Sequence, residues 1–257
     1  MSKAMEKLKT LAWFARRPSF YPHMAALITR TVTNAARHES HHREAFAWAE
    51  ERAVSRQEAL KAINLPVDAP TFPDTLVEEG CRRAATAEVD MGGPGDLDLL
   101  YGAIISSGAR RVVETGVAYG WSSLAALAAL HETQGSLVSV DMPYPKAGNE
   151  AFVGIVVPAG WRGGWTLIRK PDRNGLRDAI ARFRGEIDLC HYDSDKSYSG
   201  RMFAYPLLWR ALRPGGLFIS DDVSDNFAFR DFFERLGAEF TIIQSHGKHV
   251  GIARKLD

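Results

Sequence analysis

The chain has 257 residues, of which 46% are apolar and 25% are charged. These values are ordinary for a globular protein with room for one α/β domain and an appended segment. The 32 basic and 31 acidic residues give a net charge of +1, which argues against a nucleic-acid-binding protein, and two cysteines are too few for a disulfide framework.

The start of the chain lacks a long apolar segment followed by a small-residue cleavage site. No run reaches the roughly 18 apolar residues that a membrane span requires. We therefore expect a soluble, cytoplasmic protein with neither a membrane nor a nucleic acid as its partner.

Residues 1–90 contain almost no strand-like runs and are expected to form helices joined by proline-containing breaks. The clearest helix begins near "SHHREAFAWAEERAVS" and runs to about Leu60 with one interruption. His38, His41 and His42 have no cysteine or paired carboxylate beside them, so we interpret them as a solvated helix start. The segment is expected to cover a substrate or to form a dimer interface, and a homodimer is the predicted assembly.

From about residue 91 the pattern changes, because short β-branched runs alternate with helical segments of 10–13 residues. The strand candidates are 110–115, 136–141, 165–169, 187–193, 216–221, 240–244 and 250–254. This alternation predicts a doubly wound, Rossmann-like, mostly parallel seven-stranded sheet over residues 91–257. The last two candidates are joined by a glycine-containing turn and are expected to form an antiparallel hairpin at one edge.

The stretch "VVETGVAYGWSS" reads as a strand, a tight turn and the start of a helix. Gly116 and Gly120 allow a tight turn and a close approach of the backbone to a ligand, and Ser122 favours the helix start. The spacing G-x-x-x-G differs from the G-x-G-x-x-G of a dinucleotide site. Glu114 would oppose a pyrophosphate but suits a cationic ligand, which favours S-adenosylmethionine over NAD.

Asp141 ends the next strand, about 25 residues after the first glycine. An acidic residue at this position commonly holds the two hydroxyls of a ribose. Glu114 and Asp141 therefore support the same interpretation, a site for the nucleoside of S-adenosylmethionine.

The stretch "IDLCHYDSDKSYSG" carries an apolar run directly into charged residues, and "LFISDDVSDN" does the same. Asp193, Asp221 and Asp222 would then lie at the carboxyl ends of two adjacent strands, where ligands of doubly wound sheets bind. Like charges so close resist joint ionisation, and a hard divalent cation such as Mg²⁺ would resolve the conflict. Lys196 would share this site while facing a substrate.

Several other residues have a simpler interpretation. Cys190 and His191 lie in an apolar strand and are expected to be core residues, and His246 and His249 belong to the edge turn. Trp121 and Tyr198 flank the predicted crevice and could contact a ligand or pack in the core. Loops 142–164 and 223–230, together with the N-terminal segment, are expected to set acceptor specificity, and the glycine-rich 145–164 to form a lid.

From about residue 90 onward the chain resembles the class I S-adenosylmethionine-dependent methyltransferases. Within them it is similar to the cation-dependent O-methyltransferases typified by catechol O-methyltransferase and to the branch that methylates macrolide sugars. The resemblance rests on "VVETGVAYGWSS", "DLCHYDSDK" and "ISDD". In the sugar-methylating branch histidine usually stands where this chain has Lys196, and Asp222 replaces a more usual asparagine.

The resemblance implies roles for individual residues. It implies that Glu114, Gly116, Gly120, Ser122 and Asp141 bind the cofactor. Asp193, Asp221 and Asp222 would ligate the metal, with Asp193 also near the cofactor and Lys196 the general base. "MGGPGDLDLL" resembles the segment that closes over the cofactor, which adds Met91 and Gly92. In "RKPDRNG" only Asp172 remains as a weak candidate for an adenine contact.

The sequence thus predicts a metal-dependent O-methyltransferase acting on a hydroxylated small molecule, such as a sugar or a natural-product scaffold. One alternative is a metal-independent N- or O-methyltransferase in which the aspartates are structural. Another is a protein that binds S-adenosylmethionine without chemistry, although binding alone requires neither the aspartates nor Lys196.

Overall fold

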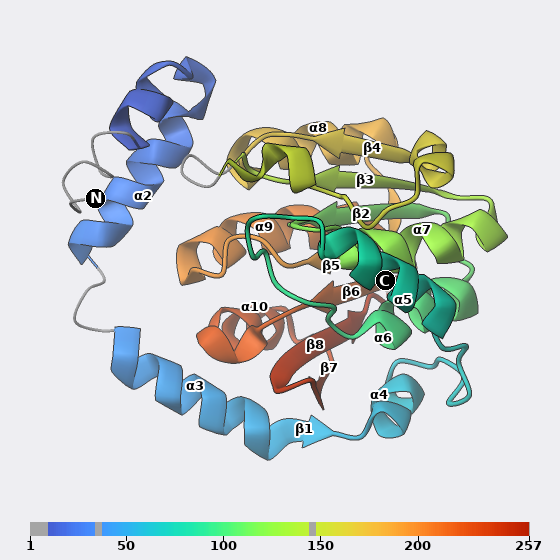
Figure 1. Ribbon diagram of the computed structural model, residues 1–257. Coiled ribbons are helices and arrows are strands. Elements are labelled where there is room, and N and C mark those ends of the chain that lie inside the picture. The colour runs from blue at the N-terminus through green and yellow to red at the C-terminus, as the bar shows by residue number, and fades with distance from the viewer. Residues whose placement is uncertain (1–9, 34–37, 144–147, 257) are drawn as a thin grey trace.

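The computed structural model describes residues 10–33, 38–143 and 148–256, and its centre is one eight-stranded sheet (Figure 1). The strands lie in the order β1-β7-β8-β6-β5-β2-β3-β4. Neighbouring strands are parallel except for β8, which is antiparallel to both β6 and β7. The bounds are β1 Ala53–Val54, β2 Arg111–Thr115, β3 Ser136–Val140, β4 Trp165–Ile168, β5 Ile187–Tyr192, β6 Leu212–Ser220, β7 Phe240–Ser245 and β8 Lys248–Arg254.

Seven of these strands are the predicted ones, and the β7–β8 hairpin is antiparallel as expected. The sequence missed β1, a two-residue strand within the segment predicted to be helical. It pairs in parallel with β7, through Ala53 beside Ile242 and Val54 beside Ile243. β1 therefore lies at the edge that the hairpin alone was expected to form.

Two hydrophobic cores lie on opposite faces of the sheet, because successive residues of a strand point to opposite sides. Val112 of β2 belongs to one core and Val113 to the other. Residues from α4 (Arg56–Ala62), α5 (Asp74–Ala84), α6 (Leu97–Ser107) and α7 (Trp121–Thr133) contribute to the first core. The second core contains residues from α3 (His38–Arg52), α8 (Asp172–Arg182), α9 (Tyr198–Ala211) and α10 (Ala228–Leu236).

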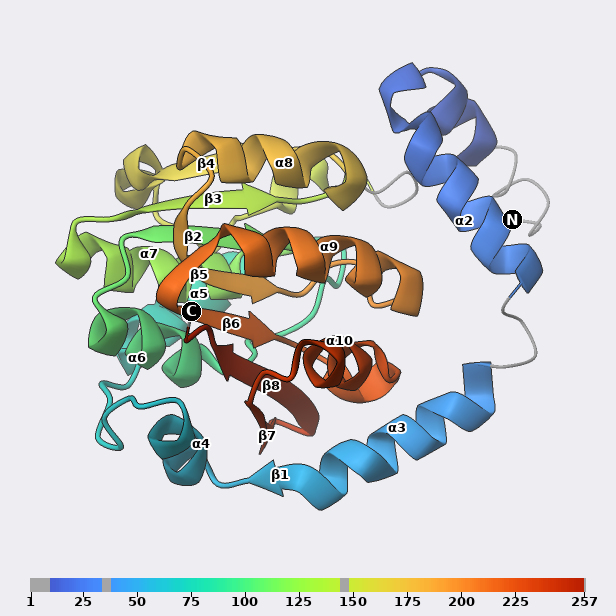
Figure 2. The same cartoon turned by 180° about the vertical axis from the view of Figure 1, so that it is seen from behind.

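The N-terminal segment divides into two parts that meet the sheet differently. A short 3₁₀ helix, η1 (Pro18–Phe20), and α2 (Tyr21–Thr33) stand apart from the sheet, beyond one end of its strands (Figures 1 and 2). The next part, α3, β1 and α4, lies along the side of the molecule that carries the hairpin. The predicted helix with one interruption is confirmed, because β1 separates α3 from α4 and Ser55 caps the second helix.

The first core is shared between residues on both sides of position 90. Leu60, Ile63 and Phe72 pack in the same cluster as Leu100 of α6 and Leu124 of α7. Helix α4 and the loop after it therefore belong to the packed body of the molecule. Among the described residues, no helix is long and apolar enough to cross a membrane.

Candidate functional site

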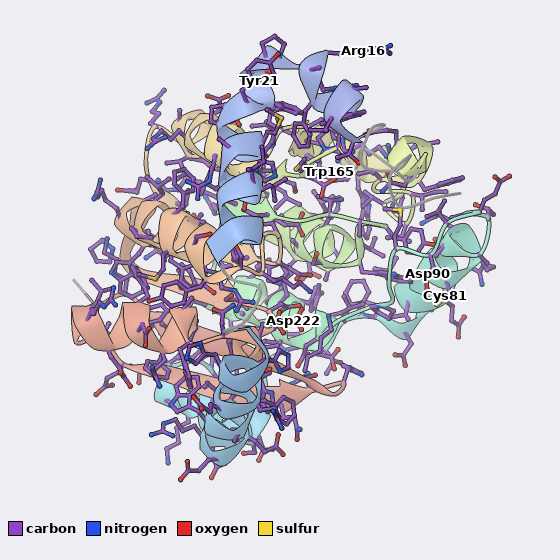
Figure 3. All side chains as sticks on the ribbon, turned by 90° about the vertical axis from the view of Figure 1, so that its left-hand side faces the viewer. Arg16, Tyr21, Cys81, Asp90, Trp165 and Asp222 are labelled. Atoms are coloured by element: carbon purple, nitrogen blue, oxygen red, sulfur yellow. The ribbon has the colours of Figure 1, made fainter. Side chains whose placement is uncertain are left out.

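A cavity of about 1140 Å³ opens at the carboxyl edge of the parallel strands. It is larger than the roughly 300–1,000 Å³ typical of a site for one small ligand, which leaves room for two reactants. Figure 3 looks at this edge, with Asp222 near its centre, α2 above it and α3 below. Residues from the N-terminal helices and from the loops after β2, β3 and β5 line the cavity.

The loop between β2 and α7 forms one wall of this cavity. Gly116 has a φ of 81° and lines the cavity, and a Cβ there would lie 2.1 Å from the backbone oxygen of Asp193. Gly120 has a φ of 89° and precedes α7, where a Cβ would lie 2.9 Å from the Cα of Gly154. Both positions therefore require glycine. Ser122 lines the cavity, whereas Gly120 packs behind it.

Glu114 lies beneath this loop and does not line the cavity. Its side chain is buried, and its Oε2 accepts hydrogen bonds from Ser123 Oγ at 2.5 Å and from Ser139 Oγ at 2.6 Å. A direct contact between Glu114 and the ammonium group of a ligand stays a prediction. The carboxylate instead fixes the strand that leads into the loop.

Asp141 follows β3 and lines the cavity as predicted for the ribose-binding position. Its Oδ1 accepts a hydrogen bond from the backbone N–H of Val117 at 3.1 Å, and its Oδ2 forms an ion pair with Arg169. Arg169 also donates a hydrogen bond to Glu150 at 2.8 Å. Sequence analysis missed Arg169, because no motif marks a partner 28 positions away.

Three further residues were predicted to contact the cofactor: Met91, Gly92 and Asp172. Met91 lines it, whereas Gly92 does not and donates its N–H to Asp90 at 2.9 Å. Asp172, the first residue of α8, lines the cavity and accepts a hydrogen bond from Ser194 Oγ at 2.5 Å. Burial raises the pKa of Asp172 to about 6.

Lys196 lies between two of the three predicted metal-binding aspartates. Its Nζ forms an ion pair with Asp222 and lies 3.4 Å from Asp193 Oδ1. Partial burial works to lower the pKa of Lys196, but Asp193 and Asp222 outweigh it, so the pKa is raised. The side chain is therefore an ammonium group in this arrangement.

The carboxylate of Asp221 lies next to His191. Its Oδ1 lies 3.4 Å from His191 Nε2, a residue of β5 that the sequence placed in the core. Burial works to raise the pKa of Asp221, but His191 lowers it overall. Burial and the charge of Asp221 raise the pKa of Asp193 to about 6.

The close convergence of three carboxylates that the sequence predicted is not formed. Within residues 10–33, 38–143 and 148–256, no group of three or more His, Cys, Asp or Glu side chains is arranged to hold a metal ion. The physical reason is that Lys196 and His191 draw Asp222 and Asp221 to separate partners. The donor chemistry still suits a hard cation, since the three side chains offer only oxygen and Asp193 Oδ1 accepts no hydrogen bond from a described residue.

The far end of the cavity is formed by the N-terminal helices and α9. Phe14, His23 and Leu27 line it, as does Phe203 of α9. His42 of α3, which we interpreted as part of a solvated helix start, also lines the cavity.

His42 Nε2 lies 3.7 Å from Asp225, so a histidine that the sequence assigned only to a solvated helix start reaches the site. The side chain of His38 lies outside the described residues, as do residues 145–147 of the predicted lid.

Other candidates lie away from the cavity. Trp121 is buried in the first core, and Tyr198 is exposed and donates its hydroxyl to Asp231 at 2.9 Å. His249 is buried in the hairpin with its Nε2 2.8 Å from Glu50 of α3. Arg201 is a further residue that the sequence did not single out, and its fully buried guanidinium donates to the backbone oxygens of Asp221 and Asp222.

Comparison with known proteins agrees with this geometry. Residues 113–223, which include the glycine loop and all three aspartates, match the family model of a methyltransferase domain. Curated protein sequences give no significant match. This segment of the chain therefore resembles a methyltransferase domain.

Solved structures share this fold at low sequence identity. A protein assigned as an O-methyltransferase from Klebsiella pneumoniae is 20% identical over 82% of this chain and 100% of its own, with a TM-score of 0.53. The O-methyltransferase from Bacillus cereus, solved with S-adenosylhomocysteine, is 17% identical over 80% and 100%, with a TM-score of 0.56. TomG from Streptomyces achromogenes, an O-methyltransferase of tomaymycin synthesis solved with S-adenosylmethionine, is 16% identical over 72% and 92%, with a TM-score of 0.55.

Proposed function

We propose that this protein transfers the methyl group of S-adenosylmethionine to a hydroxyl of a small molecule, with a divalent cation bound at the aspartates. The observation that carries the proposal is that Gly116, Asp141, Asp193 and Lys196 line one cavity. The O-methyltransferases from Bacillus cereus and Streptomyces achromogenes, whose fold the chain shares, were solved with the cofactor or its product.

The cofactor would occupy the part of the cavity between the glycine loop and Asp141. The loop offers backbone groups at Gly116 and Val117, and Asp141 offers a carboxylate for two ribose hydroxyls. Arg169 holds that carboxylate, so the ribose would have to share it or displace Arg169. Met91 and Asp172 would border the ligand from the other sides.

Asp193, Asp221 and Asp222 would hold the cation, with Mg²⁺ as the first choice because all three donors are oxygen atoms. Bound there, such an ion would lower the pKa of a coordinated hydroxyl. Binding requires Lys196 to leave Asp193 and Asp222, since it now forms ion pairs with both.

Lys196, once freed from these carboxylates, would take the proton of the acceptor hydroxyl at Nζ. Loss of its two ion pairs and the nearby positive charges would lower its pKa, as a general base requires. The acceptor oxygen then bonds to the methyl carbon, the carbon–sulfur bond breaks, and its electron pair stays on sulfur as a neutral thioether. The cavity would hold the two reactants in line.

The N-terminal helices would shape the acceptor end of the cavity. Phe14, Leu27 and Phe203 offer apolar contacts, and His42 and Asp225 offer polar ones. This mixture suits an acceptor with an apolar scaffold and several oxygens, such as a sugar-bearing or aromatic natural product.

A metal-independent methyltransferase is the second candidate. The observation that favours it is that Lys196 and His191 already partner the aspartates, so the carboxylates have counter-ions within the protein. In that case Lys196 would stay charged, and the acceptor would need to be a stronger nucleophile or to lose its proton elsewhere.

Calorimetric titration of the purified protein with S-adenosylhomocysteine and with Mg²⁺, repeated with Asp193→Ala, separates the candidates. Binding of both ligands, with Mg²⁺ binding lost in the variant, supports the metal-dependent reaction. Binding of S-adenosylhomocysteine alone supports the metal-independent enzyme. If neither binds, the cofactor assignment fails. Acceptor screening would begin with vicinal diols, in the presence of Mg²⁺ or of a chelator.

A further inference from the structure

Three side chains form a row beneath the cavity: Glu114 from β2, His191 from β5, and Asp221 from the residue that directly follows β6. Glu114 on β2 is in register with His191 on β5, so both project from the same face of the sheet. His191 is in turn in register with Ile219 of β6. Asp221 lies two residues after Ile219 in the chain. His191 Nε2 lies 3.4 Å from Asp221 Oδ1, and His191 Nδ1 lies 3.9 Å from Glu114 Oε1.

All three side chains are buried, with exposed fractions of 1% for Glu114, 5% for His191 and 9% for Asp221. Glu114 Oε1 and His191 Nδ1 face each other, and neither forms a hydrogen bond with a described residue. Burying a carboxylate is costly unless it is hydrogen-bonded or paired, and the imidazole of His191 lies within 4 Å of both acids. His191 therefore interacts with two acids at once.

The two acids adjoin different segments near the site, although neither lines the cavity itself. Glu114 precedes Thr115 and Gly116 directly, and its Oε2 also holds Ser123 in the first turn of α7. Asp221 leads into the left-handed Asp222, and its Oδ2 lies beside Gly95, in the segment that follows Met91. A displacement of Glu114 would therefore move the glycine loop, which lines the cavity, and a displacement of Asp221 would move the neighbouring backbone at Asp222 and Gly95.

We propose that His191 is a positioning residue for methyl transfer, which joins the base of the cofactor loop to the aspartates at the end of β6. It acts through Glu114 and Asp221 and contacts no reactant. The inference rests on the proposed function, because it assumes that the glycine loop binds the cofactor. It adds a dependence of cofactor binding on a side chain outside the cavity.

His249 provides a matched control within the same chain. It is also buried and paired with a carboxylate, Glu50, at 2.8 Å. That pair joins α3 to the hairpin, and neither residue lines the cavity. A general loss of stability from removing a buried histidine should therefore be similar in both positions, whereas an effect on the cofactor loop should be confined to His191.

The experiment measures the affinity for S-adenosylhomocysteine by calorimetry in metal-free buffer with a chelator, for the full chain and the variants His191→Gln and His249→Gln. Glutamine can donate to one carboxylate but cannot bridge both. We expect His191→Gln to weaken binding about tenfold, and His249→Gln to change it less than twofold at a similar melting temperature. Equal affinities of His191→Gln and the unmodified protein would overturn the inference.

Asp221→Asn interrupts the row at its other end and keeps the side-chain shape, so it serves if His191→Gln does not fold. The inference requires this variant also to weaken S-adenosylhomocysteine binding several-fold without metal, although Asp221 follows β6 and is not part of the glycine loop. Unchanged binding would refute it. If the unmodified protein fails to bind S-adenosylhomocysteine, the proposed function itself fails. This result differs from one in which the unmodified protein binds and the variants bind equally well, which would refute only the role of His191.

Discussion

Lys196, the proposed base, lies among several charged side chains. It is paired with Asp193 and Asp222, while Lys248 approaches Asp222 at 3.6 Å from the other side. We expect Lys196→Met to reduce turnover at least 100-fold, because the proposed base is removed, and to leave affinity for S-adenosylhomocysteine within about threefold.

Lys248→Met is the control for this prediction, since it removes a neighbouring charge but not the proposed base. Its turnover should stay within about fivefold of the unmodified protein. Turnover and cofactor affinity are measured side by side with any acceptor found in the screen. Parallel losses of both quantities in Lys196→Met would contradict the role of a base.

Asp172 gives a prediction about stability and pH. Burial raises its pKa from 3.8 to about 6, so the folded protein binds this proton more tightly than the unfolded chain does. The group therefore costs no stability below about pH 4, and its cost grows as the pH rises to about 6 and then stays constant.

Asp172→Asn should remove this cost. We expect the variant to gain about 3 kcal/mol of unfolding free energy relative to the unmodified protein at pH 7, and the gain to vanish near pH 4. Denaturant unfolding of both proteins across this range measures the difference. A difference that does not vary with pH would show that the carboxyl group titrates normally.

At the scale of elements, α3 is the clearest case of an accessory helix fixed to the main body. Trp48 is 9% exposed and packs against Phe227 and Phe240, with ring centroids 6.3 Å and 6.1 Å apart. Glu50 binds His249 and Gln244 of the hairpin. The helix thereby holds His42 at the cavity.

Trp48→Ala should lower the free energy of unfolding by about 3 kcal/mol, as expected for a large aromatic side chain removed from a core. Phe46→Ala, on the same helix but with 41% of its side chain exposed, should cost less than about 1 kcal/mol. Chemical denaturation of the two variants checks the pair. Similar losses would indicate that α3 is held by something other than the buried face.

The sequence predicted elements better than it predicted contacts between them. The strands from β2 to β8 were recognisable because each is a short apolar or β-branched run bounded by helical periodicity. β1 has only two residues, too few to show any period. Asp193 and Asp141 could be proposed because each directly follows a strand end, and Lys196 because it lies three residues beyond Asp193. Arg169, His42 and the bridging position of His191 depend on partners remote in sequence.

At the scale of the whole molecule, the two parts of the N-terminal segment should differ in their importance for stability. η1 and α2 reach the body near α8, where Asn174 donates to the backbone oxygen of Ser19 at 2.7 Å. α3 and β1 pack instead on the second core and on β7.

Two truncations test this difference. Removal of residues 1–37 should lower the melting temperature by only a few degrees and leave S-adenosylhomocysteine binding nearly unchanged. It should weaken binding of the acceptor, because Phe14 and Leu27 are removed from the cavity. Removal of residues 1–54 should lower the melting temperature by about 10 °C, because buried Trp48 and Ala49 are lost as well. Equal shifts would mean that α2 contributes as much as α3.

The two-residue strand β1 has a further consequence for how the molecule behaves in a crowded solution. Without it, the parallel side of β7 would present unpaired backbone N–H and C=O groups at the rim of the sheet, which is a template for pairing with another chain. A segment that contributes two residues to the sheet thus protects the molecule from self-association. Its loss should appear in light scattering as aggregation at temperatures where the cores are still folded.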